Sequence, residues 1–166
     1  MDKNSIIDKK SFEVCTNAED HPKVFVCDKL IAPAVALLNK KGYKTFASCS
    51  GHYKIEFYEY LNEDIKNLEE YQKYDDVIIK KVRDDSFDYW LEVSKTENYI
   101  LFAKEYKFDT LPEGFKVEYD PRTHIWSEIS FYDENNEHRK RSDIQNEIED
   151  KCNRLKEWAE CLPNIN

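Results

Sequence analysis

Glycine is scarce in this chain, and long apolar runs are missing from it. Gly42, Gly51 and Gly114 are the three glycines among 166 residues, whereas glycine normally makes up about 7% of a protein. Each of them is therefore expected to meet a need of the backbone. No apolar run approaches the roughly 20 residues of a membrane span, and the charged residues 1–10 do not resemble a signal peptide. We expect a protein that does not bind membranes.

Positive charge is also in short supply. Lys and Arg number 25 against 34 Asp and Glu, which gives a formal charge of −9. Strong binding to a nucleic-acid backbone needs clustered Lys and Arg, and the one basic run, residues 138–141, is expected to be a solvated helix entry. The acidity leaves a protein partner open, because an acidic chain can imitate nucleic acid and block a basic protein.

The five cysteines are odd in number and show no CxxC spacing. In a chain long enough to fold without disulfides, this pattern indicates free thiols and a reducing, cytoplasmic compartment. Apolar residues make up 40% and aromatic residues 14% of the chain, which is too much for intrinsic disorder. The sequence points to no particular cofactor.

Residue periodicity predicts one α+β domain over residues 1–166. A polar lead-in at 1–22 precedes a strand–helix–strand unit with strands at 23–27 and 43–48, and Asp28 is expected to cap the helix between them. An antiparallel β-meander follows, and an amphipathic helix at 142–162 packs on the sheet, starting with a capping box of Ser142 and Gln145. The elements predicted between these regions are strands at 53–57, 77–82, 87–93, 98–104, 115–119 and 125–131, a helix from residue 62, and turns at 94–97 and 120–123.

The loop after the second strand is the candidate site. If the strands at 23–27 and 43–48 are parallel, their carboxyl ends meet at one edge, which brings Asp28 near this loop. Glycine lets backbone N–H groups converge on a phosphate or carboxylate, hydroxyls add donors, and histidine titrates near neutrality. The residues predicted to bind a small anionic or nucleotide-like ligand are Asp28, Thr45, Ser48, Cys49, Ser50, Gly51 and His52.

Three other interpretations of this loop stay open. It can be a structural turn, with Cys49 as a small buried apolar residue. Cys49 can be a nucleophile if His52 or backbone dipoles favour its thiolate. Zinc held by Cys49, His52, Cys27 and either His21 or Cys15 is a further option, although no second tight pair completes the usual pattern.

Residues 28–52 also carry a resemblance. The pattern is Asp28, Ile31, Pro33, Leu38-Asn39, Gly42-Tyr43, Thr45 and Ser48-Cys49-Ser50-Gly51-His52. It is similar to small uncharacterised proteins of Gram-positive bacteria and their phages, which imply no particular function. It also resembles the wybutosine-synthesising TYW-three family of tRNA methyltransferases, where a Tyr-x-Thr and a Ser-Cys-Ser-Gly run follow a helix and arginine usually stands in place of His52.

Three hypotheses on function follow. The first is a small cytosolic binding protein that holds an anionic, nucleotide-like ligand at residues 48–52, as a phage-type sequestering or inhibitory protein would. The second is a nucleotide- or RNA-modifying enzyme that uses Cys49 or His52. The third is an acidic inhibitor that mimics nucleic acid and binds a protein. We favour the first, because a chain with so little glycine places one in this loop and the sequence shows no complete catalytic set.

Overall fold

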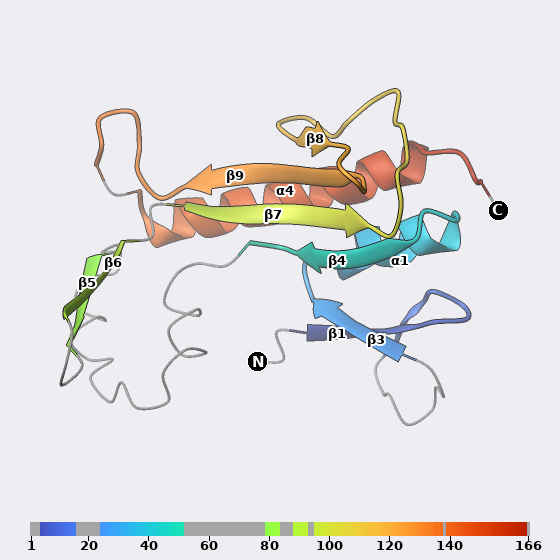
Figure 1. Ribbon diagram of the computed structural model, residues 1–166, viewed down its shortest axis with the longest axis horizontal. Coiled ribbons are helices and arrows are strands. Elements are labelled where there is room, and N and C mark those ends of the chain that lie inside the picture. The colour runs from blue at the N-terminus through green and yellow to red at the C-terminus, as the bar shows by residue number, and fades with distance from the viewer. Residues whose placement is uncertain are drawn as a thin grey trace.

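The computed structural model describes residues 4–15, 24–51, 79–83, 88–92, 95–137 and 139–165. Its elements form antiparallel sheets and a C-terminal helix packed on one of them, which is an α+β fold (Figure 1). The predicted fold class is therefore confirmed. The predicted strand at 53–57, the helix from residue 62 and the site residue His52 lie outside the described residues.

A four-stranded antiparallel sheet forms the centre of the fold. Its strand order is β4–β7–β9–β8, with β4 at Thr45–Cys49, β7 at Lys95–Phe102, β8 at Lys116–Glu118 and β9 at His124–Ser130. Helices α1 (Ala32–Lys40) and α4 (Arg141–Cys161) pack against each other behind this sheet (Figure 1). The sheet therefore has one face covered by the two helices and one face turned away from them.

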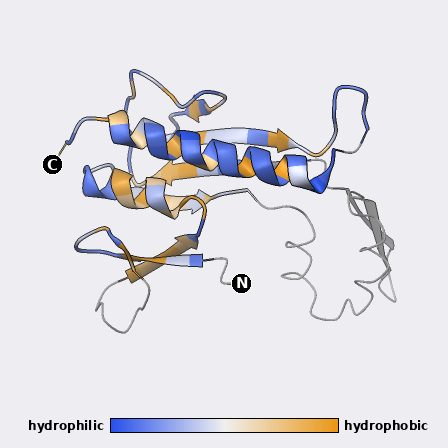
Figure 2. Cartoon of the chain, turned by 180° about the vertical axis from the view of Figure 1, so that it is seen from behind, coloured by the Kyte–Doolittle hydropathy of each residue, from blue (hydrophilic) through white to orange (hydrophobic). Residues whose placement is uncertain are grey.

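Alternation along the central strands buries every second side chain against the helices. In β7 the buried side chains are Asn98, Ile100 and Phe102, and in β9 they include Ile125 and Ile129. The matching positions of α4 repeat every three or four residues, which places one stripe of the helix in the core. They are Ile144, Ile148, Cys152, Leu155, Trp158 and Ala159. Figure 2 shows the hydrophilic residues along the outer side of this helix.

The first residues form strands and not the predicted polar lead-in. β1 (Asn4–Asp8) pairs antiparallel with β2 (Val14–Cys15) and with β3 (Val24–Asp28), in the order β2–β1–β3. Ile7 is fully buried in the main hydrophobic cluster. Local sequence indicates this strand only weakly, because Ile6 and Ile7 are a single apolar pair among charged and polar neighbours.

Helix α1 connects β3 to β4 as predicted, but Asp28 does not cap it. Ile31 is the N-cap residue, with no side-chain capping bond, and Pro33 lies in the first turn, where its missing N–H leaves no helical bond unmade. The chain leaves the helix through Gly42, whose φ of 98° is a left-handed conformation that suits glycine.

Two further predictions are wrong in detail. Lys140 is the N-cap of α4 and makes no side-chain cap bond, so Ser142 and Gln145 do not form a capping box, and Gln145 bonds to Glu149 instead (3.0 Å). Residues 95–97 belong to β7 and not to a turn, because they pair with residues 128–130 of β9.

A separate hairpin pairs β5 (Ile79–Arg83) with β6 (Asp88–Glu92) in antiparallel fashion. This agrees with the strands predicted at 77–82 and 87–93. In the described part of the chain, no helix has both the length and the apolar character that a membrane span requires.

Candidate functional site

The ends of β3 and β4 lie together, as the strand–helix–strand arrangement predicts. Asp28 ends β3, and its Oδ2 accepts hydrogen bonds from the backbone N–H of Ser50 (2.9 Å) and from the Ser50 hydroxyl (3.2 Å). The two strands belong to different sheets. The Asp28 side chain therefore bridges the two strands at this end, and no backbone hydrogen-bond ladder pairs them in the described part of the chain.

The backbone amides of Ser50 and Gly51, in the bend after β4, already have acceptors within the protein. The Gly51 N–H points to Sγ of Cys49 at 3.4 Å, while Asp28 takes the Ser50 N–H. Ser50 is 4% exposed, and the φ of 85° at Gly51 explains why glycine stands there. The expectation that these two amides are free to hold an anion is therefore wrong. A carboxylate beside them also repels an anion.

A buried amide extends this network to α4. Asn98 Nδ2 donates to the carbonyl oxygen of Ser50 (2.9 Å) and lies 3.1 Å from Sγ of Cys152. Asn98 is fully buried, and its Oδ1 has no partner among the described residues. Burial is the main cause that raises the pKa of the Cys152 thiol to about 12. Cys152 is thus a core thiol, and the bend is a fixed structural element.

Asn98 was missed by sequence reasoning, although a lone amide in the apolar run of residues 98–104 was a usable signal. Buried polar side chains are nearly always hydrogen-bonded. An asparagine at that position therefore indicates a partner in the core, and the structure identifies it as the backbone of Ser50.

At the start of β4, Thr45 is fixed to α1 through Asn39. Asn39 Nδ2 donates to Thr45 Oγ1 (2.7 Å) and to the carbonyl oxygen of Val35 (2.8 Å), and Asn39 Oδ1 accepts the Thr45 N–H (3.2 Å). Asn39 is 7% exposed, so these bonds are largely shielded from water. They set the position of β4 against the helix.

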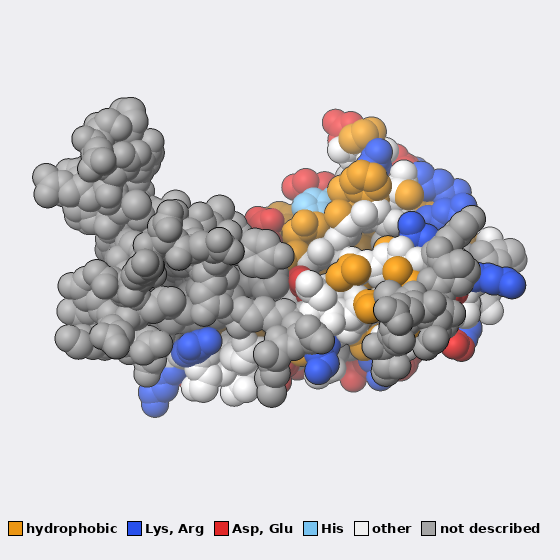
Figure 3. Space-filling view, turned by 90° about the horizontal axis from the view of Figure 1, so that it is seen from below, with side chains coloured by type: hydrophobic (Ala, Val, Ile, Leu, Met, Phe, Trp, Pro, Cys, Tyr) orange, Lys and Arg blue, Asp and Glu red, His pale blue; other side chains and the backbone are white. Residues whose placement is uncertain are grey.

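A cavity of about 640 Å³ opens between β3 and β4. Phe25, Val26 and Cys27 line it from β3, residues 45–48 line it from β4, and Val35 and Asn39 reach it from α1. Val26 is 59% exposed at its border. Figure 3 shows hydrophobic side chains gathered on this side of the molecule.

The turn between β1 and β2 brings a ring and a cation to this cavity. Asp8 shapes the turn, because its Oδ1 accepts the backbone N–H bonds of Lys10 and Ser11, both at 2.7 Å. Phe12 has a φ of 55°, which is rare for a bulky side chain. Lys9 and Phe12 both line the cavity.

The cavity therefore combines apolar walls with two cationic side chains, Lys9 and Lys44. Both are exposed. Thr45 and Ser48 add hydroxyl groups, so two of the predicted ligand residues belong to this cavity. Aromatic and aliphatic walls with a few placed polar groups are typical of small-molecule sites. Lys9 is not among the residues predicted from the sequence. The available signal is the turn-forming spacing of an aspartate and a serine three residues later, which lies within the predicted polar lead-in.

The cysteines of the chain are free. Burial first, and the charge of Asp28 second, raise the pKa of the Cys27 thiol to about 12, so Cys27 lines the cavity in its neutral form. Among the described residues no group of three or more His, Cys, Asp or Glu is placed to hold a metal ion. The histidines of the zinc alternative, His21 and His52, lie outside the described residues. A nucleophilic role for Cys49 stays a prediction.

No protein-family model, no curated protein and no solved structure matches this chain.

Proposed function

We propose that this protein binds an anionic, nucleotide-like small molecule in the cavity between β3 and β4. The observation that carries the proposal is that Lys9 and Lys44 line the same cavity of about 640 Å³ as a set of apolar side chains. A flat ring would lie against those walls, and its anionic group would face the two lysines. The free thiols agree with a cytoplasmic setting.

The size and the rim of the cavity support a ligand of this class. Small-molecule sites usually measure about 300–1,000 Å³, and this cavity falls within that range. Phe46 is 64% exposed and Val26 59% exposed where they border it. Large apolar side chains that gather at the mouth of a cavity often mark a binding site. A bound ring would cover both of them.

The two lysines extend from fixed points of the backbone. The Lys44 N–H donates to the Tyr106 hydroxyl (3.0 Å), and the Lys44 carbonyl accepts the Ala103 N–H (2.8 Å). Lys9 starts from the turn that Asp8 holds. Long, flexible side chains on a rigid frame can attract a phosphate from solution and follow it into the cavity.

The thiol inside the cavity favours binding over covalent chemistry. Only a thiolate is a strong nucleophile, and the pKa of Cys27 is raised to about 12 by burial and by Asp28. Cys27 therefore offers a ligand a small apolar contact and does not attack it.

The test is a calorimetric titration of the protein with AMP, and with adenosine as the uncharged comparison. AMP should bind more tightly than adenosine. Lys9→Gln and Lys44→Gln should each weaken AMP binding by roughly 5- to 30-fold, because an exposed charge-assisted contact is worth about 1–2 kcal/mol. Adenosine binding should hardly change in either variant.

The matched control is Lys10→Gln, which removes the same charge one residue away from Lys9 and outside the cavity lining. It should leave the AMP affinity within about twofold of the native value. If AMP does not bind, or if Lys10→Gln weakens binding as much as Lys9→Gln, the cavity is not the anion site.

A further inference from the structure

The sheet face turned away from the two helices carries a cluster of rings, which we call the aromatic shelf: Tyr99 of β7 with His124 and Trp126 of β9. Tyr99 and Trp126 are paired in register. The His124 ring centroid lies 5.5 Å from that of Tyr99 and 6.5 Å from that of Trp126. All three side chains are half-buried, so part of each ring stays accessible.

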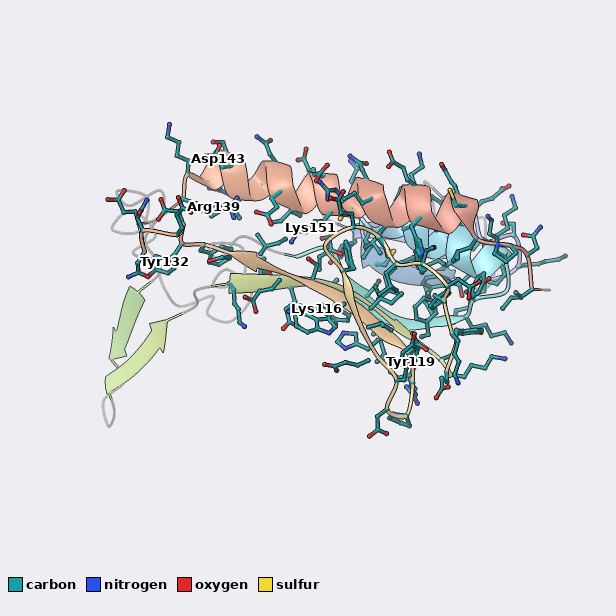
Figure 4. The ribbon with its side chains drawn as sticks, turned by 90° about the horizontal axis from the view of Figure 1, so that it is seen from above. Lys116, Tyr119, Tyr132, Arg139, Asp143 and Lys151 are labelled. Carbon is teal, nitrogen blue, oxygen red and sulfur yellow. The ribbon has the colours of Figure 1, made fainter. Side chains whose placement is uncertain are left out.

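Two cations lie over rings on this face. Lys116 Nζ is 4.8 Å from the Trp126 ring centroid, and the guanidinium carbon of Arg122 is 4.3 Å from that of Phe46. Figure 4 shows Lys116 on the side of the sheet opposite α4. A cation over a ring face is held by the ring quadrupole, and its charge can still meet a phosphate.

The shelf also carries negative charge and one hydrogen-bond donor that has no acceptor among the described residues. Glu118 Oε2 lies 3.9 Å from His124 Nδ1, and Glu97 alternates onto the same face of β7. The indole N–H of Trp126 is buried and has no acceptor among the described residues. The face is thus mixed in charge. It favours a ring with one nearby phosphate over a long polyanion.

Phe46 joins the aromatic shelf to the cavity. It lines the cavity, is 64% exposed and lies beneath Arg122. Ala47 pairs with Leu101, and Leu101 pairs with His124. Neighbouring strands are about 4.8 Å apart, so Tyr99 of the shelf lies one strand from β4, and His124 and Trp126 lie two strands, or about 10 Å, from it. Figure 3 shows hydrophobic side chains between the cavity side and the histidine, with lysine and arginine beside them.

We infer that the ligand is a dinucleotide, with one base in the cavity and the second on the aromatic shelf. This inference rests on the proposed function and names the ligand class of that site. Arg122 lies between the two positions and would meet the phosphate that links the nucleosides. Lys9 and Lys44 would hold the terminal phosphate. The net charge of −9 restricts such binding to short ligands, because a long strand needs many more cations.

The second base has a measurable effect. Stacking of a base on an aromatic side chain changes affinity by roughly 5- to 150-fold when the side chain is removed. A dinucleotide should therefore bind at least fivefold more tightly than the mononucleotide. That advantage should disappear when the aromatic shelf is damaged.

The test compares AMP with the dinucleotide pApA by calorimetry in four proteins: native, Tyr99→Leu, Arg122→Gln and Tyr132→Leu. Tyr99→Leu keeps an apolar residue in β7, and Arg122→Gln leaves the sheet core untouched. Both should bring pApA affinity down towards that of AMP while AMP affinity stays within about twofold. Tyr132 lies near the start of α4, away from the shelf (Figure 4), and Tyr132→Leu should change neither affinity.

The outcomes separate this inference from the proposed function. If AMP and pApA bind equally well to the native protein, or if Tyr99→Leu and Arg122→Gln preserve the tighter binding of pApA, the inference of a dinucleotide ligand is overturned. The proposed mononucleotide site in the cavity is then unaffected. If neither compound binds, the proposed function fails and the inference fails with it. A selective loss of pApA affinity in both variants supports the dinucleotide.

Discussion

The carboxylate of Asp28 should stabilise the fold by holding the bend after β4, and the variant Asp28→Ala tests this. Asp28 Oδ2 accepts the backbone N–H of Ser50 at 2.9 Å and the Ser50 hydroxyl at 3.2 Å. The hydroxyl has a second acceptor in the Gly51 carbonyl at 3.4 Å, but no other partner of the Ser50 N–H is seen in the described residues. Removing the carboxylate leaves that buried N–H unpaired.

The magnitude follows from the cost of an unpaired buried donor. Such a group costs about 1–3 kcal/mol, so Asp28→Ala should lower the free energy of unfolding by about 2 kcal/mol. For a chain of this length, 1 kcal/mol corresponds to about 2–4 °C in melting temperature, which predicts a drop of about 4–8 °C. Asp28→Asn keeps an acceptor oxygen and loses only the charge, so its cost should be about half as large.

The assay is urea unfolding followed by tryptophan fluorescence, with thermal melts beside it. Asp109 is exposed, and Asp109→Ala serves as the control, because surface substitutions usually stay within about 0.5 kcal/mol. The reasoning is refuted if Asp28→Ala unfolds at the same urea concentration as the native protein. A stable Asp28→Ala protein that no longer binds AMP would instead make Asp28 a ligand contact.

Three further predictions concern other parts of the fold. Gly51→Ala and Gly114→Ala should each cost about 1–2 kcal/mol in urea unfolding, because both residues have positive φ, while an added Cβ meets ordinary van der Waals contacts at Gly51 and open space at Gly114; a much larger loss at Gly51 would mean that packing there dominates. Burial raises the pKa of Glu147, but hydrogen bonds and charge from its basic partners outweigh burial and lower it overall. Because its pKa is lowered, ionised Glu147 contributes its full stability above about pH 4.3 and loses it as the pH falls further. Glu147→Gln should therefore reduce the loss of unfolding free energy in acid by less than about 1 kcal/mol. An unchanged dependence of stability on pH would contradict this. Cys27 and Cys152, with pKa values raised to about 12, should react with iodoacetamide at pH 8 roughly a thousandfold more slowly than a free thiol, and rapid labelling seen by mass spectrometry would show that they are not buried thiols.

The periodic elements of the fold were predictable because their patterns are long. The apolar stripe of α4 repeats over 21 residues. In β7 (Lys95–Phe102) the apolar run from residue 98 predicts a strand, whereas the polar residues 95–97 before it predict a turn. The two strands at the N-terminus were not predictable in the same way. β2 has two residues, and β1 is held by its pairing with β3, a partner some twenty residues away in sequence.

The position of the candidate site could be predicted from the sequence, but its hydrogen bonds and its cavity could not. The carboxyl ends of β3 and β4 lie close enough for Asp28 to bond Ser50, as the order of these elements in the sequence suggests. The sequence could not show that the carboxylate would take the amide of Ser50, because Asp28 suited a helix cap equally well. The cavity depends on the gap between two sheets and on Lys9 from a distant turn. Neither follows from local patterns.

The most direct test of the central claim is an NMR titration of the nitrogen-15-labelled protein with AMP. The account predicts that shifted amide signals gather at Lys9, Phe12 and residues 44–48, with small changes at Gly51. Signals that shift only at Gly51 and its sequence neighbours, or that do not shift at all, would contradict a nucleotide site between β3 and β4.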